Sequence, residues 1–268
     1  MLNSAPDTLS KEKIISYMSN SATKNIVVLE TVNSTNAYAK ELATAPFFSG
    51  TTVIANHQTN GRGRLGRDFF SPENTGIYMS ILLDPKQIHL SSNLLTVAAG
   101  VAVCRVLQKL CPAQPAIKWV NDIFINGKKV CGILAEGTYS AGSQELSSVV
   151  VGIGINISTP DTVFPGELGN IAGSVFPENI SRNQIIAGII NEFYSLYMSS
   201  DSKSLIKEYE SYQLILGKKI SFSAKGEAYE GTAVSVNYEG NLIVVLDNGE
   251  EITLKSGEIS LGSSNFIK

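Results

Sequence analysis

The segment that most constrains the fold is GRGRLGR at residues 61–67. Gly61, Gly63 and Gly66 fit the pattern G-x-G-x-x-G, which in a dinucleotide-binding fold opens a helix directly after a strand. The residues that follow, RDFFSPENTG, include Pro72 and several small polar residues, so they disfavour a helix and lead into another strand. Without a helix N-terminus, no row of free backbone amides would face a pyrophosphate. We therefore expect a loop here and not the start of a Rossmann fold.

The same loop carries three arginines, Arg62, Arg64 and Arg67, whose guanidinium groups can pair with phosphate or carboxylate oxygens. Their charges repel one another when no anion is bound, so we expect the loop to become ordered when an anion arrives. A solvent-exposed basic turn is the alternative. A nucleic-acid-binding role is disfavoured, because a single copy without interleaved aromatic residues lies in an acidic chain.

The composition disfavours several classes of protein. With 21 basic and 24 acidic residues, the chain has no general positive field that would attract nucleic acid. The cysteines and histidines lack metal-ligand spacing, and the first 20 residues lack the pattern of a secretory signal. The apolar segment 94–110 is interrupted by charged residues and is expected to be too short for a membrane span. We expect a reduced, cytoplasmic protein with no structural metal, no membrane span and no nucleic-acid partner.

The periodicity of the apolar residues predicts an α+β protein. Helices are expected over residues 11–18, 36–43, 91–110, 181–198 and 203–213. Strands are expected over residues 25–29, 51–56, 76–83, 117–125, 128–136 and 148–157. After residue 216 the pattern changes to short strands and turns, punctuated by Lys225-Gly226 among others. We therefore predict a larger α+β domain, the candidate catalytic domain, over residues 1–216 and a small SH3-like barrel over residues 217–268.

A hairpin with a two-residue turn at 126–127, Asn-Gly, is the strongest local prediction. Such a turn would place Phe124 opposite Lys129 and Asp122 opposite Cys131. Lys129 and Asp122 would then lie diagonally on one face, a cation beside a carboxylate. Together with the arginine loop, this pair suits phosphoryl or nucleotidyl chemistry, in which Asp122 is a candidate Mg²⁺ ligand. A surface ion pair of little consequence is the alternative.

Six segments, in chain order, strongly resemble the biotin protein ligase family. They are Asn33-Ser34-Thr35-Asn36; Gln58 with residues 61–67; Lys118-Trp119-x-Asn121-Asp122; Lys128-Lys129-Val130-x-Gly132-Ile133-Leu134-x-Glu136; Gly152-x-Gly154-Ile155-Asn156; and Gly257-Glu258-Ile259-Ser260-Leu261. The resemblance implies a catalytic domain like those of biotin ligases and class II aminoacyl-tRNA synthetases, followed by an SH3-like barrel. It also implies that biotin and MgATP give biotinyl-5'-AMP, from which biotin passes to one lysine of a biotin carboxyl carrier protein or domain, such as that of acetyl-CoA carboxylase.

The resemblance also implies roles for individual residues on the biotin side. Ser34, Thr35 and Gln58 match groups that hydrogen-bond the ureido ring, together with backbone that starts at Gly61. Gly132 matches a position that leaves room for the biotin chain. Trp119 matches a residue that packs beside the pocket.

On the nucleotide side, the resemblance assigns the reacting carboxylate and phosphate to cationic groups. Arg62 and Arg64 match loop arginines that close over these anions, and Lys129 matches the lysine that contacts both. Arg67 is expected near the adenylate. The matching positions for the nucleotide and Mg²⁺ are Asn121, Asp122 and Asn156.

Three positions depart from the family pattern: Leu65 replaces an arginine, Val120 a proline, and Cys131 a small residue. We expect an active enzyme, because Arg62, Arg64 and Arg67 remain in the loop. The sequence leaves open whether the charge lost at Leu65 alters the retention of the adenylate. Because the family core begins near residue 25, we expect a monofunctional ligase with no DNA-binding domain at its N-terminus. A lipoate or octanoate ligase of the same fold and a non-catalytic SH3-like interaction module are the alternatives. The sequence leaves monomer and homodimer open.

Overall fold

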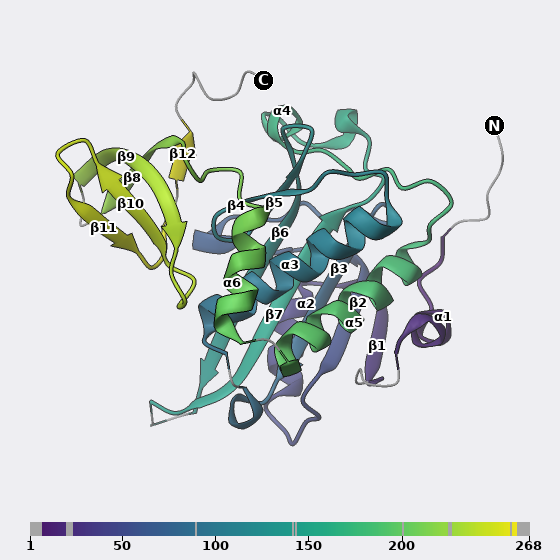
Figure 1. Ribbon diagram of the computed structural model, residues 1–268. Coiled ribbons are helices and arrows are strands. Elements are labelled where there is room, and N and C mark those ends of the chain that lie inside the picture. The colour runs from purple at the N-terminus through teal and green to yellow at the C-terminus, as the bar shows by residue number, and fades with distance from the viewer. Residues whose placement is uncertain are drawn as a thin grey trace.

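The computed structural model describes residues 7–19, 24–88, 90–140, 142, 144–199, 201–224, 227–257 and 259–261. They form a larger mixed β-sheet covered by helices and a smaller antiparallel sheet near the C-terminus (Figure 1). This is the α+β class that the sequence predicts. The expected turn at Lys225-Gly226 and the motif residue Glu258 lie outside the described residues.

The larger sheet has one parallel strand pair and is otherwise antiparallel. Its strands are β1 (Ile26–Val32), β2 (Thr51–Gln58), β3 (Gly76–Leu83), β4 (Ala116–Lys118), β5 (Asp122–Ile125), β6 (Lys128–Tyr139) and β7 (Leu146–Asn156). Their spatial order is β1-β2-β3-β7-β6-β5-β4, and β1 runs parallel to β2. The centre of the sheet is therefore β3, β7 and β6, most of whose buried apolar residues belong to the same core cluster as those of α3 (Ser92–Leu110) and α5 (Arg182–Ser199).

Every helix predicted from the sequence is present, with bounds that differ by at most two residues. The helices are α1 (Lys11–Tyr17), α2 (Thr35–Leu42), α3 (Ser92–Leu110), α4 (Leu168–Ile171), α5 (Arg182–Ser199) and α6 (Ser202–Ser211). Short 3₁₀ turns are η1 (Arg64–Gly66), η2 (Pro85–Gln87) and η3 (Asp161–Val163). No helix follows the arginine loop over residues 67–76, so the exclusion of a Rossmann fold is confirmed.

The two faces of the larger sheet are covered differently. The long helices α3 and α5 and the shorter α6 lie over one face (Figure 1), with fully buried side chains such as Ile81 and Ile153 in the same apolar cluster as α3 and α5. On the opposite face, Val53, Leu82 and Val150 surround Ala39 of α2. Adjacent strand residues point to opposite faces, which is why Ile81 and Leu82 belong to different clusters.

Helix α3 is a core helix. Contrary to the expectation from the sequence, its segment Asn93–Leu110 is long and apolar enough to cross a membrane, but 72% of that segment is buried inside the protein. Ser91 caps its first turn by accepting a hydrogen bond from the Leu94 amide. A helix that is apolar on nearly every side fits its central position between the sheet and two other helices.

The single strand predicted over residues 117–125 is wrong. The chain reverses at Trp119-Val120-Asn121, so that β4 and β5 form a tight hairpin in which Lys118 pairs with Asp122. No glycine or proline announces this turn. It is held by distant groups, since the Tyr209 hydroxyl donates to the Val120 carbonyl at 2.8 Å.

The predicted hairpin at residues 126–127 is confirmed, but its register changes part of the way along. Phe124 pairs with Lys129 as predicted, whereas Asp122 pairs with Gly132 and not with Cys131. The difference is one extra residue on β6, a β-bulge next to Phe124. A bulge depends on the packing of the finished sheet, so the turn sequence alone did not reveal it.

The C-terminal region forms a five-stranded antiparallel sheet, in agreement with the short strands predicted there. Its strands are β8 (Lys219–Ala224), β9 (Glu227–Val236), β10 (Leu242–Leu246), β11 (Glu251–Leu254) and β12 (Ile259–Leu261), in the order β11-β10-β9-β8-β12. Strand β12, which the apolar pattern did not predict, pairs with β8.

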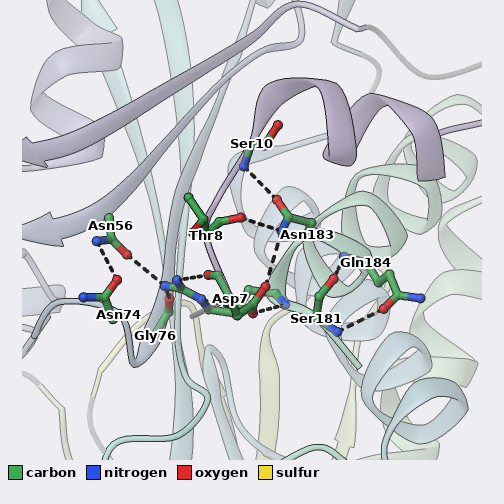
Figure 2. A network of polar contacts seen from close by, with 10 residues as sticks. Asp7, Thr8, Ser10, Asn56, Asn74, Gly76, Ser181, Asn183 and Gln184 are labelled. Carbon is green, nitrogen blue, oxygen red and sulfur yellow. Dashed lines mark hydrogen bonds and ion pairs between the residues drawn. The ribbon is translucent and has the colours of Figure 1, made fainter. Parts of the chain in front are cut away.

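A buried arginine joins the N-terminal segment to the core. Arg182, at the start of α5, is 2% exposed and donates to the carbonyl oxygens of Asp7 and Gly76 and to the side chain of Asn56. Figure 2 shows the surrounding contacts, in which the neighbouring Asn183 accepts from the Ser10 amide and donates to the Thr8 carbonyl. The network fixes residues 7–10 against the start of β3 and the start of α5.

Candidate active site

A cavity of about 470 Å³ lies beside the N-terminus of α2. Its walls come from the arginine loop, from the hairpins of β4, β5 and β6, and from the segment 164–172. Every site residue predicted from the sequence lines this cavity except Gly61. Those that line it are Ser34, Thr35, Gln58, Arg62, Arg64, Arg67, Trp119, Asn121, Asp122, Lys129, Gly132 and Asn156.

Two paired glycines form part of the cavity floor. Gly132 of β6 lies opposite Gly154 of β7, and the ring of Phe69 covers both. A Cβ atom at Gly154 would lie 2.6 Å from the ring, and one at Gly132 would lie 3.3 Å from it. A side chain at Gly154 would therefore displace Phe69, which follows directly after the arginine loop.

Gly152, the other glycine of the β7 motif, makes room for a polar side chain. A Cβ atom there would collide with Oδ1 of Asn36. Asn36 is 4% exposed and also lines the cavity. The two glycines of β7 are thus approached closely by Asn36 and Phe69, neither of which was singled out in the sequence as a site residue.

Two of the predicted ureido-binding residues, Thr35 and Gln58, are hydrogen-bonded to each other, and Ser34 precedes them at the start of α2. Ser34 caps α2, which leaves Thr35 as the first helical residue, with its backbone amide 2.8 Å from Oε1 of Gln58. Nε2 of Gln58 in turn donates to Ser71 at 2.9 Å. Gly61 packs behind this group, since a Cβ atom there would collide with the Phe69 carbonyl and with Ser71. Gly61 therefore supports the site from outside the cavity.

The arginine loop folds back on itself. The Gly63 amide donates to the Arg67 carbonyl at 2.7 Å, and the Phe69 amide donates to the Gly61 carbonyl at 2.9 Å. At the tip, Leu65 has a φ of 56° and is 73% exposed. A left-handed conformation is unusual for a leucine, and such conformations often occur in binding loops.

The loop and the hairpin meet across the cavity. Nη1 of Arg64 donates to Oδ1 of Asn121 at 3.0 Å. Nζ of Lys129 lies 2.7 Å from Oδ1 of Asp122, so the predicted cation beside a carboxylate is confirmed. A guanidinium group, an ammonium group and one carboxylate thereby converge on one end of the cavity.

Asn156, at the end of β7, is linked through Gly173 to the backbone of Lys129. Its side-chain amide donates to the Gly173 carbonyl at 3.0 Å, and the Gly173 amide donates to the Lys129 carbonyl at 2.9 Å. Oδ1 of Asn156 is buried and accepts no hydrogen bond from the described residues. A buried acceptor without a donor points to a bound group that supplies one.

Trp119 connects the cavity to the C-terminal sheet. The residue is 3% exposed, and its indole nitrogen donates to the Gly240 carbonyl at 3.0 Å. Ile259 and Ser260 of β12 also line the cavity. The small sheet therefore contributes directly to the site. The family resemblance had assigned no site role to Ile259 or Ser260.

Behind the cavity wall, Glu136 is held as an anion. Burial alone would raise the pKa of its carboxyl group, but hydrogen bonds from Lys40 and Asn36 and the charges of Lys40 and Arg62 outweigh burial and lower that pKa. Nζ of Lys40 lies 2.6 Å from one carboxylate oxygen. Glu136 is thus an acceptor at neutral pH, although it does not line the cavity itself.

Among the described residues, no group of three or more metal-ligating side chains is present. Asp122 is the carboxylate that pairs with Lys129 at the charged end of the cavity. One protein carboxylate is compatible with Mg²⁺ that arrives with phosphate oxygens as its other ligands, because Mg²⁺ is often bound in this way.

Comparison with known families gives two matches along the chain. Residues 28–156 match the Biotin/lipoate A/B protein ligase family, and residues 215–262 match the Biotin protein ligase C terminal domain. The first match spans the cavity from Ser34 to Asn156, and the second spans the small sheet.

Individual relatives agree with this result. The chain is 35% identical over 245 residues to the bifunctional ligase/repressor BirA of Bacillus subtilis, covering 89% of this chain and 74% of that protein. It is 26% identical to the biotin--[acetyl-CoA-carboxylase] ligase of Mycobacterium tuberculosis, covering 88% of each. Among solved structures, the Aquifex aeolicus biotin protein ligase in complex with biotin and ATP superposes with a TM-score of 0.74 at 28% identity, covering 90% of this chain and 99% of that one. The fold, the ordered motifs and these similarities together show that the chain belongs to the biotin protein ligase family.

Proposed function

We propose that the protein is an ATP-dependent biotin protein ligase that joins biotin to a lysine of a biotin carboxyl carrier protein or domain. The observation that carries this proposal is that Ser34, Thr35 and Gln58 line the same cavity as Arg64 and Lys129. The first set offers neutral hydrogen-bonding groups for a ureido ring. The second set offers cations for a carboxylate and a phosphate.

The first step joins two anions, so its barrier depends on charge neutralisation and on orientation. An oxygen of the biotin carboxylate attacks the α-phosphorus of ATP, and the bond from that phosphorus to the pyrophosphate oxygen breaks. Arg64 and Lys129 are positioned to stabilise the negative charge that accumulates on the α-phosphate. Arg62 and Arg67 add positive charge from the same loop.

In the second step the ε-amine of the carrier lysine attacks the biotinyl carbonyl carbon, and AMP leaves as the bond to its phosphate oxygen breaks. Phe69, seated on Gly132 and Gly154, closes one side of the cavity and limits the access of water. Limited access matters, because an acyl adenylate hydrolyses when water reaches it.

Asn121, Asp122 and Asn156 are proposed to face the nucleotide. Asp122 would share Mg²⁺ with the phosphates, since it lies beside Lys129 at the charged end of the cavity. Oδ1 of Asn156 would accept a hydrogen bond from the adenine amino group or the ribose. Gly132 would leave space for the biotin chain, and Trp119 would form its wall.

The match of residues 215–262 to the Biotin protein ligase C terminal domain supports biotin, and not lipoate or octanoate, as the acyl substrate. If the protein were a non-catalytic SH3-like interaction module, the presence of Arg64 and Lys129 in one cavity would have no explanation. We also propose that the two domains divide near residues 216/217, that the protein acts in the cytoplasm, and that nucleic acid is not a partner.

The proposal is tested by incubating the purified protein with biotin and MgATP and measuring pyrophosphate release together with the mass of the bound product. Formation of one biotinyl adenylate per active site is the expected result. If pyrophosphate is released with lipoate or octanoate but not with biotin, the acyl substrate is misassigned; release with none of them refutes the ligase.

A further inference from the structure

We propose that a buried relay of hydrogen bonds, running from Glu136 through Asn36 and Ser80, fixes Thr35 as a hydrogen-bond acceptor and thereby selects ligands that present an N–H to it. Neither Glu136 nor Ser80 lines the cavity, so both would act as positioning residues behind its wall. The inference rests on the proposed function, because the ureido ring of biotin supplies the N–H.

The relay begins at an anion. One carboxylate oxygen of Glu136 lies 2.6 Å from Nζ of Lys40, and the other lies 2.8 Å from Nδ2 of Asn36. An ionised carboxylate only accepts hydrogen bonds. The Asn36 amide therefore turns its nitrogen toward Glu136 and, over a longer distance of 3.4 Å, toward the Leu134 carbonyl oxygen. This leaves its Oδ1 pointing the opposite way.

The orientation of the Asn36 amide determines where the hydroxyl proton of Ser80 points. Its Oγ lies 2.6 Å from Oδ1 of Asn36, and Oδ1 only accepts, so the single hydroxyl proton of Ser80 is directed to Asn36. The same Oγ is 2.7 Å from Oγ1 of Thr35. Ser80 is fully buried, so this contact is made inside the protein. Ser80 has no second proton to give, so only the hydroxyl proton of Thr35 can form a hydrogen bond across this contact.

The other neighbour of Thr35 is an acceptor as well. Ser71 donates to the Phe69 carbonyl and accepts from Nε2 of Gln58, so Oε1 of Gln58 faces Thr35. That oxygen lies 3.1 Å from Oγ1 of Thr35. Whether the hydroxyl proton of Thr35 goes to Ser80 or to Gln58, it stays within the protein. The lone pairs of Thr35 then face the cavity.

A fixed acceptor discriminates between ligands of the same shape. An N–H of the ureido ring can donate to Thr35, whereas an oxygen atom in its place would meet lone pairs and leave Thr35 without a donor. Sites that hydrogen-bond a substrate group reject analogues without that group, because a buried polar atom is left unpaired.

The test compares the binding of biotin with that of its two cyclic carbamate analogues, in which one or the other ureido N–H is replaced by oxygen. Calorimetry without ATP gives the three dissociation constants. The wild type is expected to prefer biotin over at least one analogue by about tenfold or more, the size of one well-placed hydrogen bond.

The decisive variant is Glu136→Gln. The ammonium group of Lys40 only donates hydrogen bonds, so it is expected to bind the amide oxygen of the new glutamine side chain. The amide nitrogen of that side chain must then face Asn36. Asn36 then turns its own nitrogen to Ser80, Ser80 donates to Thr35, and Thr35 loses an acceptor position. The preference for biotin is expected to fall to about threefold or less.

Two further variants separate the relay from a merely structural role. Lys40→Met removes the same ion pair but leaves the Glu136 carboxylate as an acceptor, so the preference should persist. In the double variant Lys40→Met with Glu136→Gln, the amide is free to turn its oxygen to Asn36, so the preference should return. Glu41→Gln, on an exposed position of the same helix, is the matched control and should behave as wild type.

An unchanged preference in Glu136→Gln would overturn the relay, as would an equal loss in Lys40→Met. Failure of the double variant to regain the preference would also overturn it. If the wild type does not bind biotin at all, the proposed function fails instead, which keeps the two conclusions distinguishable.

Discussion

Arg64 and Asn121 lie 57 residues apart in the sequence, yet Nη1 of the arginine is 3.0 Å from Oδ1 of the asparagine. This contact fastens the arginine loop to the hairpin that carries Asp122 and Lys129. It places a second cation at the same end of the cavity as the Lys129 ammonium group. The loop and the hairpin therefore act together on any anion that binds there.

Arg64→Ala and Lys129→Ala should each slow the formation of the adenylate by about a hundredfold or more. Each variant removes one preorganised cation that would stabilise the negative charge developing on the α-phosphate. Single-turnover pyrophosphate release measures this rate. Lys128→Ala is the control: its ammonium group pairs with Asp161 at a largely exposed position, and its loss should change the rate by less than about fivefold. Near-normal rates in both test variants would show that the charges are misassigned.

Gly154→Ala should weaken biotin binding more than Gly132→Ala. The new Cβ atom would lie 2.6 Å from the Phe69 ring in the first variant and 3.3 Å in the second, so the first forces a much larger movement of the ring than the second. Biotin dissociation constants test the order, and melting temperatures identify variants that fail to fold. Equal binding by both variants would contradict the role of Phe69 as a wall of the cavity.

Backbone amides of residues 61–67 should exchange with solvent faster in the free protein than in the presence of biotin and MgATP. The arginines of this loop repel one another until an anion binds between them. Hydrogen exchange measured by mass spectrometry tests this expectation, with the peptide over 219–224 as an internal reference that should not change. Equal exchange of the loop in both states would mean that it is already fixed before the ligands arrive.

Asp7→Ala should lower the free energy of unfolding by about 1–3 kcal/mol, because the variant leaves the buried Arg182 guanidinium group without its anion. Burial already lowers the pKa of Arg182. Urea unfolding measures the change. The control is Asp247→Ala, which breaks an exposed ion pair with Lys219 and should leave stability unchanged. Similar stabilities for the two variants would contradict a supporting role for the network in Figure 2.

The sequence predicted the elements that follow local rules. Each long helix, the Asn-Gly turn and the absence of a helix after the arginine loop depend on residues close together in the chain. The contact of Lys129 with Asp122 was also predicted, although the bulge on β6 changes the register in which the two residues meet. Their prediction was therefore within the reach of periodicity and turn chemistry.

The features that the sequence missed depend on distant partners. The reversal at Trp119-Val120-Asn121 contains no glycine or proline and is held by Tyr209, and the bulge near Phe124 reflects the packing of the whole sheet. Asn36 and Phe69 are identified as site residues only from the structure, because they pack on Gly152 and Gly154 of β7, which are distant in the sequence. Glycines within a strand are typical of a close approach by another group, but they do not reveal which side chains make it.

The most direct measurement of the central claim is transfer of labelled biotin. The purified protein is mixed with labelled biotin, MgATP and a biotin carboxyl carrier domain, with a second carrier domain whose target lysine is replaced by arginine as the control. The expected result is label on the first domain alone and its loss in Lys129→Ala. A carrier domain that stays unlabelled while the wild-type protein remains folded and binds both substrates would contradict the assignment of the protein as a biotin ligase.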